Sequence, residues 1–350
     1  MVTRQSPLPR VAVVGAGYWG KNLIRNFASS RHTDLIWVCD KDLDRCQATT
    51  AGFGDVKITD DFAEVLADPN VDAVAIATPV ASHAAIAEAS LHAGKHILVE
   101  KPLAGSVAEG RDLVQLADEM GRVFMTDHTF CYTSTVRHIR DMFRAGEIGD
   151  LQYFDSVRIN LGLVQPDVDV FWDLAPHDLS ILLFVLPDDI RPVRVWARGA
   201  DPLGVGKPSL GYVSIEFSNG ALANIHVNWL SPVKVRTTII GGSEKMLVWD
   251  DLNPAQRLSV FDTGVHLDGD AEERRQLLIS YRSGDMVAPA LKEREALGGL
   301  VEEFAAAIVE EREPLTSGRD GLEVLEILSA VHESLGADGA GIALDAASRR

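Results

Sequence analysis

Apolar residues in the first third of the chain follow two alternating patterns. Short continuous apolar runs are typical of buried strands. They occupy residues 10–14, 34–39, 72–77, 96–100 and 122–126. Between these runs apolar residues recur three or four positions apart, which predicts helices from residue 21 onward and at 84–92 and 107–120. Strands that alternate with helices predict a doubly wound parallel sheet, the α/β arrangement of a Rossmann domain.

After residue 128 the pattern changes to strands that follow one another directly. A helix is expected at 134–145, and strands at 151–159, 193–198, 211–217, 221–229 and 235–240. The sequence Ser218-Asn219-Gly220 favours a tight hairpin turn, because Asn-Gly readily adopts positive φ. Consecutive strands joined by tight turns predict a large, mostly antiparallel open sheet.

Two domains therefore follow from the pattern, since 350 residues exceed what one core usually holds. We expect a Rossmann domain at 1–128 and an α+β domain at 129–350. Two terminal helices are expected at 297–311 and 320–335, and whether they pack back on the first domain is left open.

The first strand runs directly into a glycine-rich turn that precedes the first helix. This strand–turn–helix context is the one that a G-x-G-x-x-G dinucleotide motif requires. The first glycine allows the tight turn, the second lets the backbone approach a pyrophosphate, and the third allows close packing of helix on strand. The alternative is a glycine turn with no ligand. The cofactor-binding residues expected here are Gly15, Gly17, Tyr18, Trp19 and Gly20.

A carboxylate follows the second strand. Asp40 stands roughly twenty residues after the last glycine, where an acidic residue hydrogen-bonds the adenosine ribose. Because a carboxylate repels a 2′-phosphate, NAD is favoured over NADP, although Lys41 could soften that preference. The alternative is an Asp that only begins a turn.

The apolar run at 96–100 ends in Glu100-Lys101-Pro102. Ligands bind beyond the carboxyl ends of the strands in an open parallel sheet, so Glu100 and Lys101 are expected to face that crevice and to contact the cofactor. The alternative is a charged end on a surface strand.

A second group of chemically active residues lies at Asp173 and His177. On a helix these two residues share one face. Because proline is tolerated only in the first turn of a helix, Pro176 predicts a helix that starts near Ala175, with Asp173 just before it. The alternative is that Asp173 caps the helix and His177 is a structural histidine.

In order and spacing these motifs resemble those of the Gfo/Idh/MocA oxidoreductases, over essentially the whole chain. The matching residues are Gly15 to Gly20, Thr78-Pro79 with His83, Gly94-Lys95-His96, Glu100-Lys101-Pro102, and Asp173 with His177. The resemblance implies NAD binding by Thr78, Pro79 and His83 as well. It also implies catalytic roles for Lys101, Asp173 and His177, and a homodimer or homotetramer formed through the second domain's sheet.

The segment from Asp127 to Tyr132 is similar to a subgroup that oxidises nucleotide-linked amino-sugar uronates at C3, or reduces sugars at C3. Two positions depart from it: Asp127 replaces a usual glycine, and Thr133-Ser134 a typical Asn-Pro. For the ring of Tyr132 and the guanidinium of Arg158, sheet or surface positions are the alternatives to sugar binding. The substrate-binding residues implied are Lys101, His128, Tyr132, Arg158, Asn160, Asp173 and His177.

Hydride transfer defines the expected roles. Histidine suits the base because its pKa lies near working pH. Asp173 would hold the imidazole of His177, and Lys101 would stabilise negative charge on the reacting oxygen or relay the proton. Which of Lys101 and His177 carries the proton first stays open.

Composition excludes several other classes of function. The net charge of −18 argues against nucleic acid or an anionic membrane as a main partner. No stretch reaches the roughly 20 apolar residues of a membrane span, and no apolar signal core precedes the first strand. Three cysteines without a pattern indicate no metal site and fit the cytoplasm.

The leading prediction is an NAD(H)-dependent oxidoreductase that acts on a secondary alcohol or ketone of a sugar, at C3 of a nucleotide sugar. The alternatives are a ketoreductase of a deoxysugar pathway, an inositol or free-sugar dehydrogenase, a glycoside hydrolase that retains NAD, and a catalytically silent NAD sensor.

Overall fold

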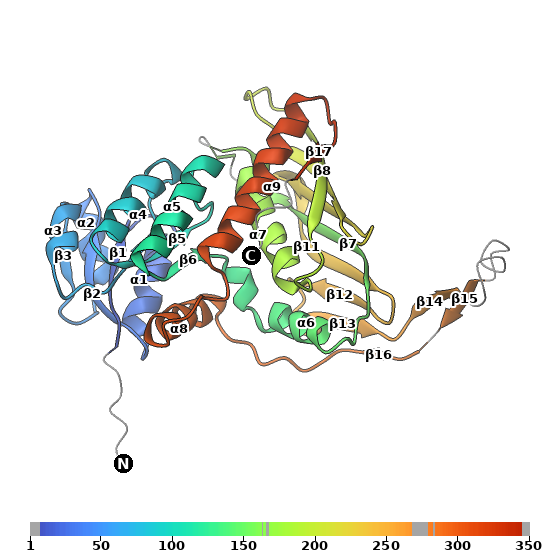
Figure 1. Ribbon diagram of the computed structural model, residues 1–350, viewed down its shortest axis with the longest axis horizontal. Helices are drawn as coiled ribbons and strands as arrows, with labels where there is room; N and C mark the ends of the chain where they lie inside the picture. Colours follow the sequence, from blue (N-terminus) through green and yellow to red (C-terminus); the bar gives the residue numbers. More distant parts are fainter. Residues whose placement is uncertain (1–7, 163, 166–167, 268–278, 283, 345–350) are drawn as a thin grey trace, which may run out of the picture. The chain divides into compact units, whose positions relative to one another are not determined.

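The computed structural model describes residues 8–162, 164–165, 168–267, 279–282 and 284–344 (Figure 1). The chain divides into two compact units. The first comprises residues 1–133 and 294–325, and the second residues 134–293 and 326–350. The first division lies near the boundary predicted after residue 128. Of the terminal helices, α8 (Ala296–Val309) and the beginning of α9 (Gly318–Gly336) belong to the first unit.

The first unit contains a six-stranded sheet in the order β3-β2-β1-β4-β5-β6, and all its strand pairs are parallel. The strands are β1 (Arg10–Val14), β2 (Asp34–Cys39), β3 (Lys57–Thr59), β4 (Ala73–Ile76), β5 (His96–Glu100) and β6 (Phe124–Asp127). The other helices are α1 (Gly20–Ser29), α2 (Leu43–Thr50), α3 (Phe62–Ala67), η1 (Val80–Ser82), α4 (His83–His92), α5 (Val107–Met120) and η2 (Thr129–Tyr132). This confirms the predicted doubly wound parallel sheet.

Local sequence explains where these elements lie. β4 is buried along its whole length, as expected of a parallel strand covered on both faces. The hydroxyl of Ser106 accepts a hydrogen bond from the Glu109 N–H at the start of α5, and Gly121 ends that helix in the left-handed conformation, with φ 59°. The sequence pattern missed α2, β3 and α3, which have only eight, three and six residues and are too short to show a clear period.

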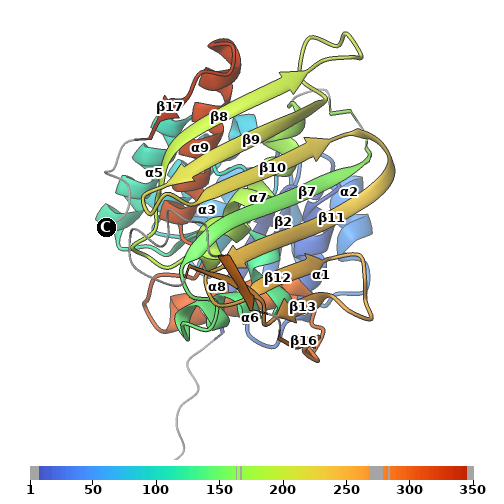
Figure 2. The same cartoon turned by 90° about the vertical axis from the view of Figure 1, so that its right-hand side faces the viewer.

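The second unit contains a nine-stranded sheet in the order β16-β13-β12-β11-β7-β10-β9-β8-β17 (Figure 2). Its longer strands are β7 (Leu151–Leu161), β8 (Pro192–Ala200), β9 (Leu210–Phe217), β10 (Leu222–Asn228) and β11 (Leu230–Gly242). The shorter strands are β12 (Met246–Asp250), β13 (Leu258–Phe261), β16 (Met286–Val287) and β17 (Ile342–Ala343), while β14 (Gly264–Leu267) and β15 (Ile279–Arg282) form a separate pair. All five predicted strands are present. Of the strand pairs that the structure describes in this sheet, only β7 and β10 are parallel, so the sheet is mostly antiparallel, as predicted.

Among the described residues of this unit, two helices lie wholly within it, α6 (Ser134–Arg144) and α7 (Val170–Val185). α7 packs on β7, β9 and β10 and buries most of its side chains there. The predicted start of this helix near Ala175 was wrong. Asp169 caps α7, because its carboxylate accepts hydrogen bonds from the backbone N–H groups of Phe171 and Trp172. Pro176 therefore lies inside the helix, where its missing N–H leaves a single carbonyl of the preceding turn without its usual bond.

Candidate active site

The glycine-rich turn between β1 and α1 has the shape that a pyrophosphate requires. Gly15 has φ +97°, and a Cβ there would lie 2.6 Å from the carbonyl oxygen of Ala77. A Cβ on Gly20 would lie 1.9 Å from the carbonyl oxygen of Gly15. At Gly17 a Cβ would meet nothing within 4 Å, so this backbone faces open space. The turn leads into the amino end of α1, where no acidic residue opposes an anion. These residues fit a dinucleotide.

Asp40 lies beside this turn. One of its carboxylate oxygens accepts a hydrogen bond of 2.7 Å from the N–H of Ala16, and the other accepts one of 3.0 Å from the N–H of Asp42. Arg45 Nη1 lies 3.6 Å from the same carboxylate. Asp40 thus helps to shape the turn, and its ribose contact stays a prediction.

His83 connects the ends of β4 and β5. One ring nitrogen lies 2.7 Å from the carbonyl oxygen of Thr78, and the other lies 3.0 Å from that of Pro102. The ring is buried, and this burial lowers the pKa of His83 more than the carbonyl contacts raise it. His83 therefore holds Thr78-Pro79 against the segment that carries Lys101. A direct contact of His83 with the cofactor remains a prediction.

At the carboxyl ends of β5 and β6 two carboxyl groups lie side by side. Glu100 and Asp127 are register partners, and both are buried. Asp127 accepts a hydrogen bond of 3.2 Å from Trp19 Nε1 and another from the hydroxyl of Thr129. Burial raises the pKa of both carboxyl groups; the neighbouring Asp127 raises that of Glu100 further, whereas Lys101 lowers it. Asp127 thus links Trp19 in the glycine-rich turn to the end of β5, where Lys101 follows Glu100.

His128 follows Asp127 and is also buried. Burial, reinforced by the charge of Lys101, lowers its pKa to about 3, so the ring is neutral at physiological pH. Among the described residues neither ring nitrogen has a hydrogen-bond partner. A buried polar group of this kind usually has a partner, so His128 keeps hydrogen-bonding capacity beside Lys101.

In the second unit α7 places Asp173 and His177 four residues apart on one helical face, both half-buried. The indole Nε1 of Trp229 donates a hydrogen bond of 2.9 Å to Asp173 Oδ2. The Trp229 side chain is 1% exposed, so this donor is fixed by its packing. Asp173 is therefore held as a hydrogen-bond acceptor in the first turn of α7.

Two residues expected to bind substrate have internal partners. Arg158 makes two hydrogen bonds to Asp178, of 2.7 and 3.1 Å, and both side chains are buried. The hydroxyl of Tyr132 lies 2.8 Å from Thr316 Oγ1, and its ring is 4% exposed. Sugar binding by Arg158 or Tyr132 stays a prediction. Asn160 lies half-buried near the end of β7.

Sequence reasoning did not name Trp229 or Asp178 as partners of the site residues. Trp229 lies 56 positions from Asp173 in the chain, and Asp178 lies 20 positions from Arg158. No local signal marks such pairs. Among the described residues no group of three or more His, Cys, Asp or Glu side chains could hold a metal ion. Within the same described part, no helix is long and apolar enough to cross a membrane.

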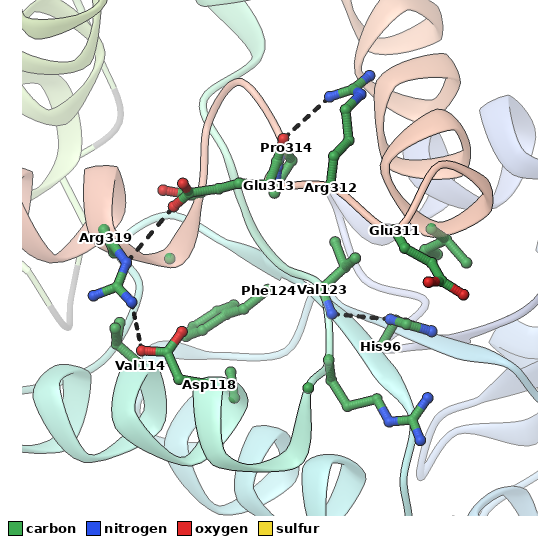
Figure 3. A pocket seen from close by; sticks show the side chains of 16 residues that line it. His96, Val114, Asp118, Val123, Phe124, Glu311, Arg312, Glu313, Pro314 and Arg319 are labelled. Atoms are coloured by element: carbon green, nitrogen blue, oxygen red, sulfur yellow. Dashed lines mark hydrogen bonds and ion pairs between the residues drawn. The ribbon is translucent and has the colours of Figure 1, made fainter. Parts of the chain in front are cut away.

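A cavity of 650 Å³ lies at the opposite edge of the first sheet, at the amino ends of β5 and β6 (Figure 3). There the N–H of Val123 donates to His96 Nδ1 at 2.9 Å, and Arg319 bridges Asp118 and Glu313. Burial, with the nearby Arg122, lowers the pKa of His96 to about 4. None of the predicted site residues lines this cavity, so it is separate from the cofactor edge.

Comparison with known proteins agrees with this geometry. Residues 9–128 match a family described as "Oxidoreductase family, NAD-binding Rossmann fold", and residues 136–248 match the GFO/IDH/MocA C-terminal domain. UDP-N-acetylglucosamine 3-dehydrogenase of Acidithiobacillus ferrooxidans is 27% identical over 326 residues, which cover 90% of this chain and 94% of that protein.

Two further relatives extend the comparison. The dTDP-3,4-didehydro-2,6-dideoxy-alpha-D-glucose 3-reductase of Streptomyces violaceoruber is 35% identical over 194 residues, 52% of this chain and 56% of that protein. The crystal structure of GenD2 from gentamicin A biosynthesis, in complex with NAD, is 25% identical and covers 99% of this chain and 100% of that one, with a TM-score of 0.78. The chain belongs to the Gfo/Idh/MocA family of NAD-binding oxidoreductases.

Proposed function

We propose that this protein transfers a hydride between NAD(H) and C3 of a nucleotide-linked sugar. One observation carries the proposal: α7 presents Asp173 and His177 on one face, and Trp229 fixes the orientation of Asp173. An imidazole four residues from a fixed carboxylate is the arrangement that a general base of a dehydrogenase needs. The relatives that act at C3 of nucleotide sugars support the choice of substrate.

Each residue has one role in this proposal. NAD bound at the glycine-rich turn supplies the hydride acceptor. His177 takes the proton of the sugar hydroxyl at a ring nitrogen, while Asp173 selects its tautomer and stabilises the imidazolium. Lys101 donates a hydrogen bond to the reacting oxygen and stabilises the negative charge that develops there. His83 holds the strand ends that carry Lys101 in place.

The reductive direction is the second candidate. The Streptomyces violaceoruber relative, with the highest identity among the proteins compared above, is a 3-reductase. The same residues serve both directions, because His177 returns to the product hydroxyl the proton that it takes in the oxidation.

The open face of the nine-stranded sheet supports a homodimer or homotetramer as part of the proposal. Side chains on the face away from α7 include several exposed apolar groups, such as Tyr212 (54% exposed), Leu222 (48%) and Ile239 (38%). The ring of Tyr212 stacks on His226, with centroids 4.4 Å apart. Large apolar side chains exposed on an open sheet face are compatible with an interface. We also place the enzyme in the cytoplasm, because Cys39, Cys46 and Cys131 are buried and form no disulfide.

The test is a substrate panel followed by NADH absorbance. The panel contains UDP- and dTDP-sugars, a UDP-linked amino-sugar uronate, inositols and free sugars, each with NAD. NADH formed only with nucleotide sugars, with the 3-keto product identified by mass spectrometry, supports the proposal. NADH formed with inositol or a free sugar contradicts the nucleotide-sugar assignment. Substrate turnover without released NADH would identify an enzyme that retains NAD, such as the glycoside hydrolase alternative.

A further inference from the structure

Glu100 and Asp127 form a pair of buried carboxyl groups at the cofactor edge. Each is the last residue of its strand, and the two strands are parallel neighbours in register, so their side chains lie next to each other. Glu100 is 8% exposed and Asp127 is 2% exposed. Burial raises the pKa of both groups, and the neighbouring Asp127 raises that of Glu100 further. Two adjacent carboxylates buried together repel each other strongly, so one of the two is protonated and the pair carries one proton.

The surrounding donors indicate which carboxyl group is ionised. Asp127 accepts hydrogen bonds from Trp19 Nε1 and from the hydroxyl of Thr129. Several donors directed at one carboxylate stabilise its charged form. Burial and the adjacent charge of Asp127 both raise the pKa of Glu100. The proton therefore resides on Glu100 and the negative charge on Asp127.

The strand order places this charge in one half of the dinucleotide site. A six-stranded sheet in the order 3-2-1-4-5-6 consists of two mononucleotide-binding halves. Asp40, at the end of β2, belongs to the half that takes the adenosine. Glu100 and Asp127 end β5 and β6 in the other half, which takes the nicotinamide nucleotide.

We propose that Glu100 and Asp127 share one proton and keep a single buried negative charge in the nicotinamide half of the site, where it favours binding of NAD⁺ over NADH. The oxidised nicotinamide ring carries a positive charge and the reduced ring is neutral. A fixed negative charge therefore stabilises the oxidised form selectively. At an effective dielectric constant of 20, one charge within about 10 Å changes the ratio of the two affinities roughly 10-fold.

This pair does not change the overall equilibrium of the reaction. It changes the relative affinity of the enzyme for NAD⁺ and NADH. The inference depends on NAD binding and is independent of which sugar is the substrate. Lys101, the neighbouring cation, is the same in every variant compared below, so its charge cancels in the comparison.

The test compares dissociation constants for NAD⁺ and NADH, measured by calorimetry on the same preparation of the full chain without substrate. Asp127→Asn removes the negative charge, and we expect the ratio Kd(NADH)/Kd(NAD⁺) to fall roughly 10-fold. Glu100→Gln replaces the proton donor with an amide N–H donor and leaves Asp127 ionised, so its ratio should match that of the wild type. Glu100 could become ionised in the single Asp127→Asn variant and replace the missing charge. The double variant Glu100→Gln/Asp127→Asn has neither carboxylate and should therefore show the full fall in this ratio.

Asp112→Asn, an exposed position on α5, is the control for a change of net charge. Equal weakening of NAD⁺ and NADH in the double variant would overturn the proposal and leave Asp127 with only a structural role beside Trp19. If Kd(NADH)/Kd(NAD⁺) falls in Glu100→Gln but keeps its wild-type value in Asp127→Asn, the proton does not reside on Glu100 and that assignment is overturned. If Asp127→Asn does not fold, Asp127→Gly removes the same carboxyl group and tests the same ratio.

Discussion

His332 Nε2 lies 2.6 Å from Asp169 Oδ2, and this ion pair joins α9 to the first residue before α7. The other ring nitrogen lies 3.0 Å from the carbonyl oxygen of Leu328. Asp169 uses its other carboxylate oxygen to cap α7. The helix that carries Asp173 and His177 is thus held at its first turn by a titratable group on another helix.

This pair makes stability depend on pH. Burial lowers the pKa of His332, but the hydrogen bond to Asp169 and the contact with Leu328 outweigh it, so the net pKa is raised. A raised pKa in the folded state means that the stabilisation is complete below the ordinary value near 6.5 and is lost as pH rises through the folded value. We expect His332→Gln to lower Tm at pH 6 and to differ much less from the wild type at pH 9. His92→Gln, on an exposed side chain, serves as the control. A Tm difference that grows with pH would contradict this assignment.

A second prediction concerns the bond from Trp229 to Asp173. Trp229→Phe keeps an aromatic ring in the core but removes the N–H donor together with the five-membered ring of the indole, so Asp173 loses its fixed orientation. We expect kcat to fall roughly 10-fold with a shifted pH profile of kcat/KM, and Tm to fall because the smaller ring leaves a cavity. The matched control is Trp249→Phe, because Trp249 is also buried and its Nε1 has no partner among the described residues. Equal kinetic losses in both variants would show that ring packing, and not the hydrogen bond, is responsible.

Substitutions in the ion pair between Arg158 and Asp178 test whether Arg158 stabilises the fold. Arg158→Met leaves the Asp178 carboxylate buried without its cation, which costs about 3–5 kcal/mol of unfolding free energy. The double variant Arg158→Met/Asp178→Leu should recover much of that loss. In the exposed pair of Arg319 and Asp118, Arg319→Met should cost less than about 1 kcal/mol. Denaturant unfolding measures all three; a cost below about 1 kcal/mol for Arg158→Met would refute the structural role.

Substitutions in the glycine-rich turn distinguish effects on folding from effects on NAD binding. In Gly17→Ala the new Cβ meets nothing, so Tm should stay unchanged while NAD binds at least about 10-fold more weakly. In Gly20→Ala the Cβ would lie 1.9 Å from a backbone oxygen, so Tm should fall as well. Gly54→Ala, where a Cβ is also free of contacts, is the control for both measurements. Unchanged NAD affinity in Gly17→Ala would contradict the placement of the pyrophosphate.

The sequence predicted those parts of the site that depend on local constraints. The turn from Gly15 to Gly20 and the charged end of β5 have recognisable local patterns, and the structure places them at one edge of one sheet. The start of α7 was predicted wrongly, because Asp169 caps the helix well before Pro176, which lies inside the helix and not in its first turn. The partners of Asp173, Arg158 and Asp169 could not be predicted, since they come from distant segments that only sheet and helix packing brings together.

The last prediction addresses the catalytic roles directly. Lys101→Ala and His177→Ala should each lower kcat at least about 100-fold, because each removes a group that stabilises charge or transfers a proton at the reacting oxygen. Lys234→Ala and His92→Ala, at exposed positions, are the matched controls and should turn over normally. NAD affinity and Tm are measured alongside, so that a loss of kcat is not mistaken for a loss of cofactor or fold. Because His177 is proposed as the base, exogenous imidazole should partly restore turnover in His177→Ala and leave Lys101→Ala unchanged. Near-normal kcat in either alanine variant would refute the role assigned to that residue.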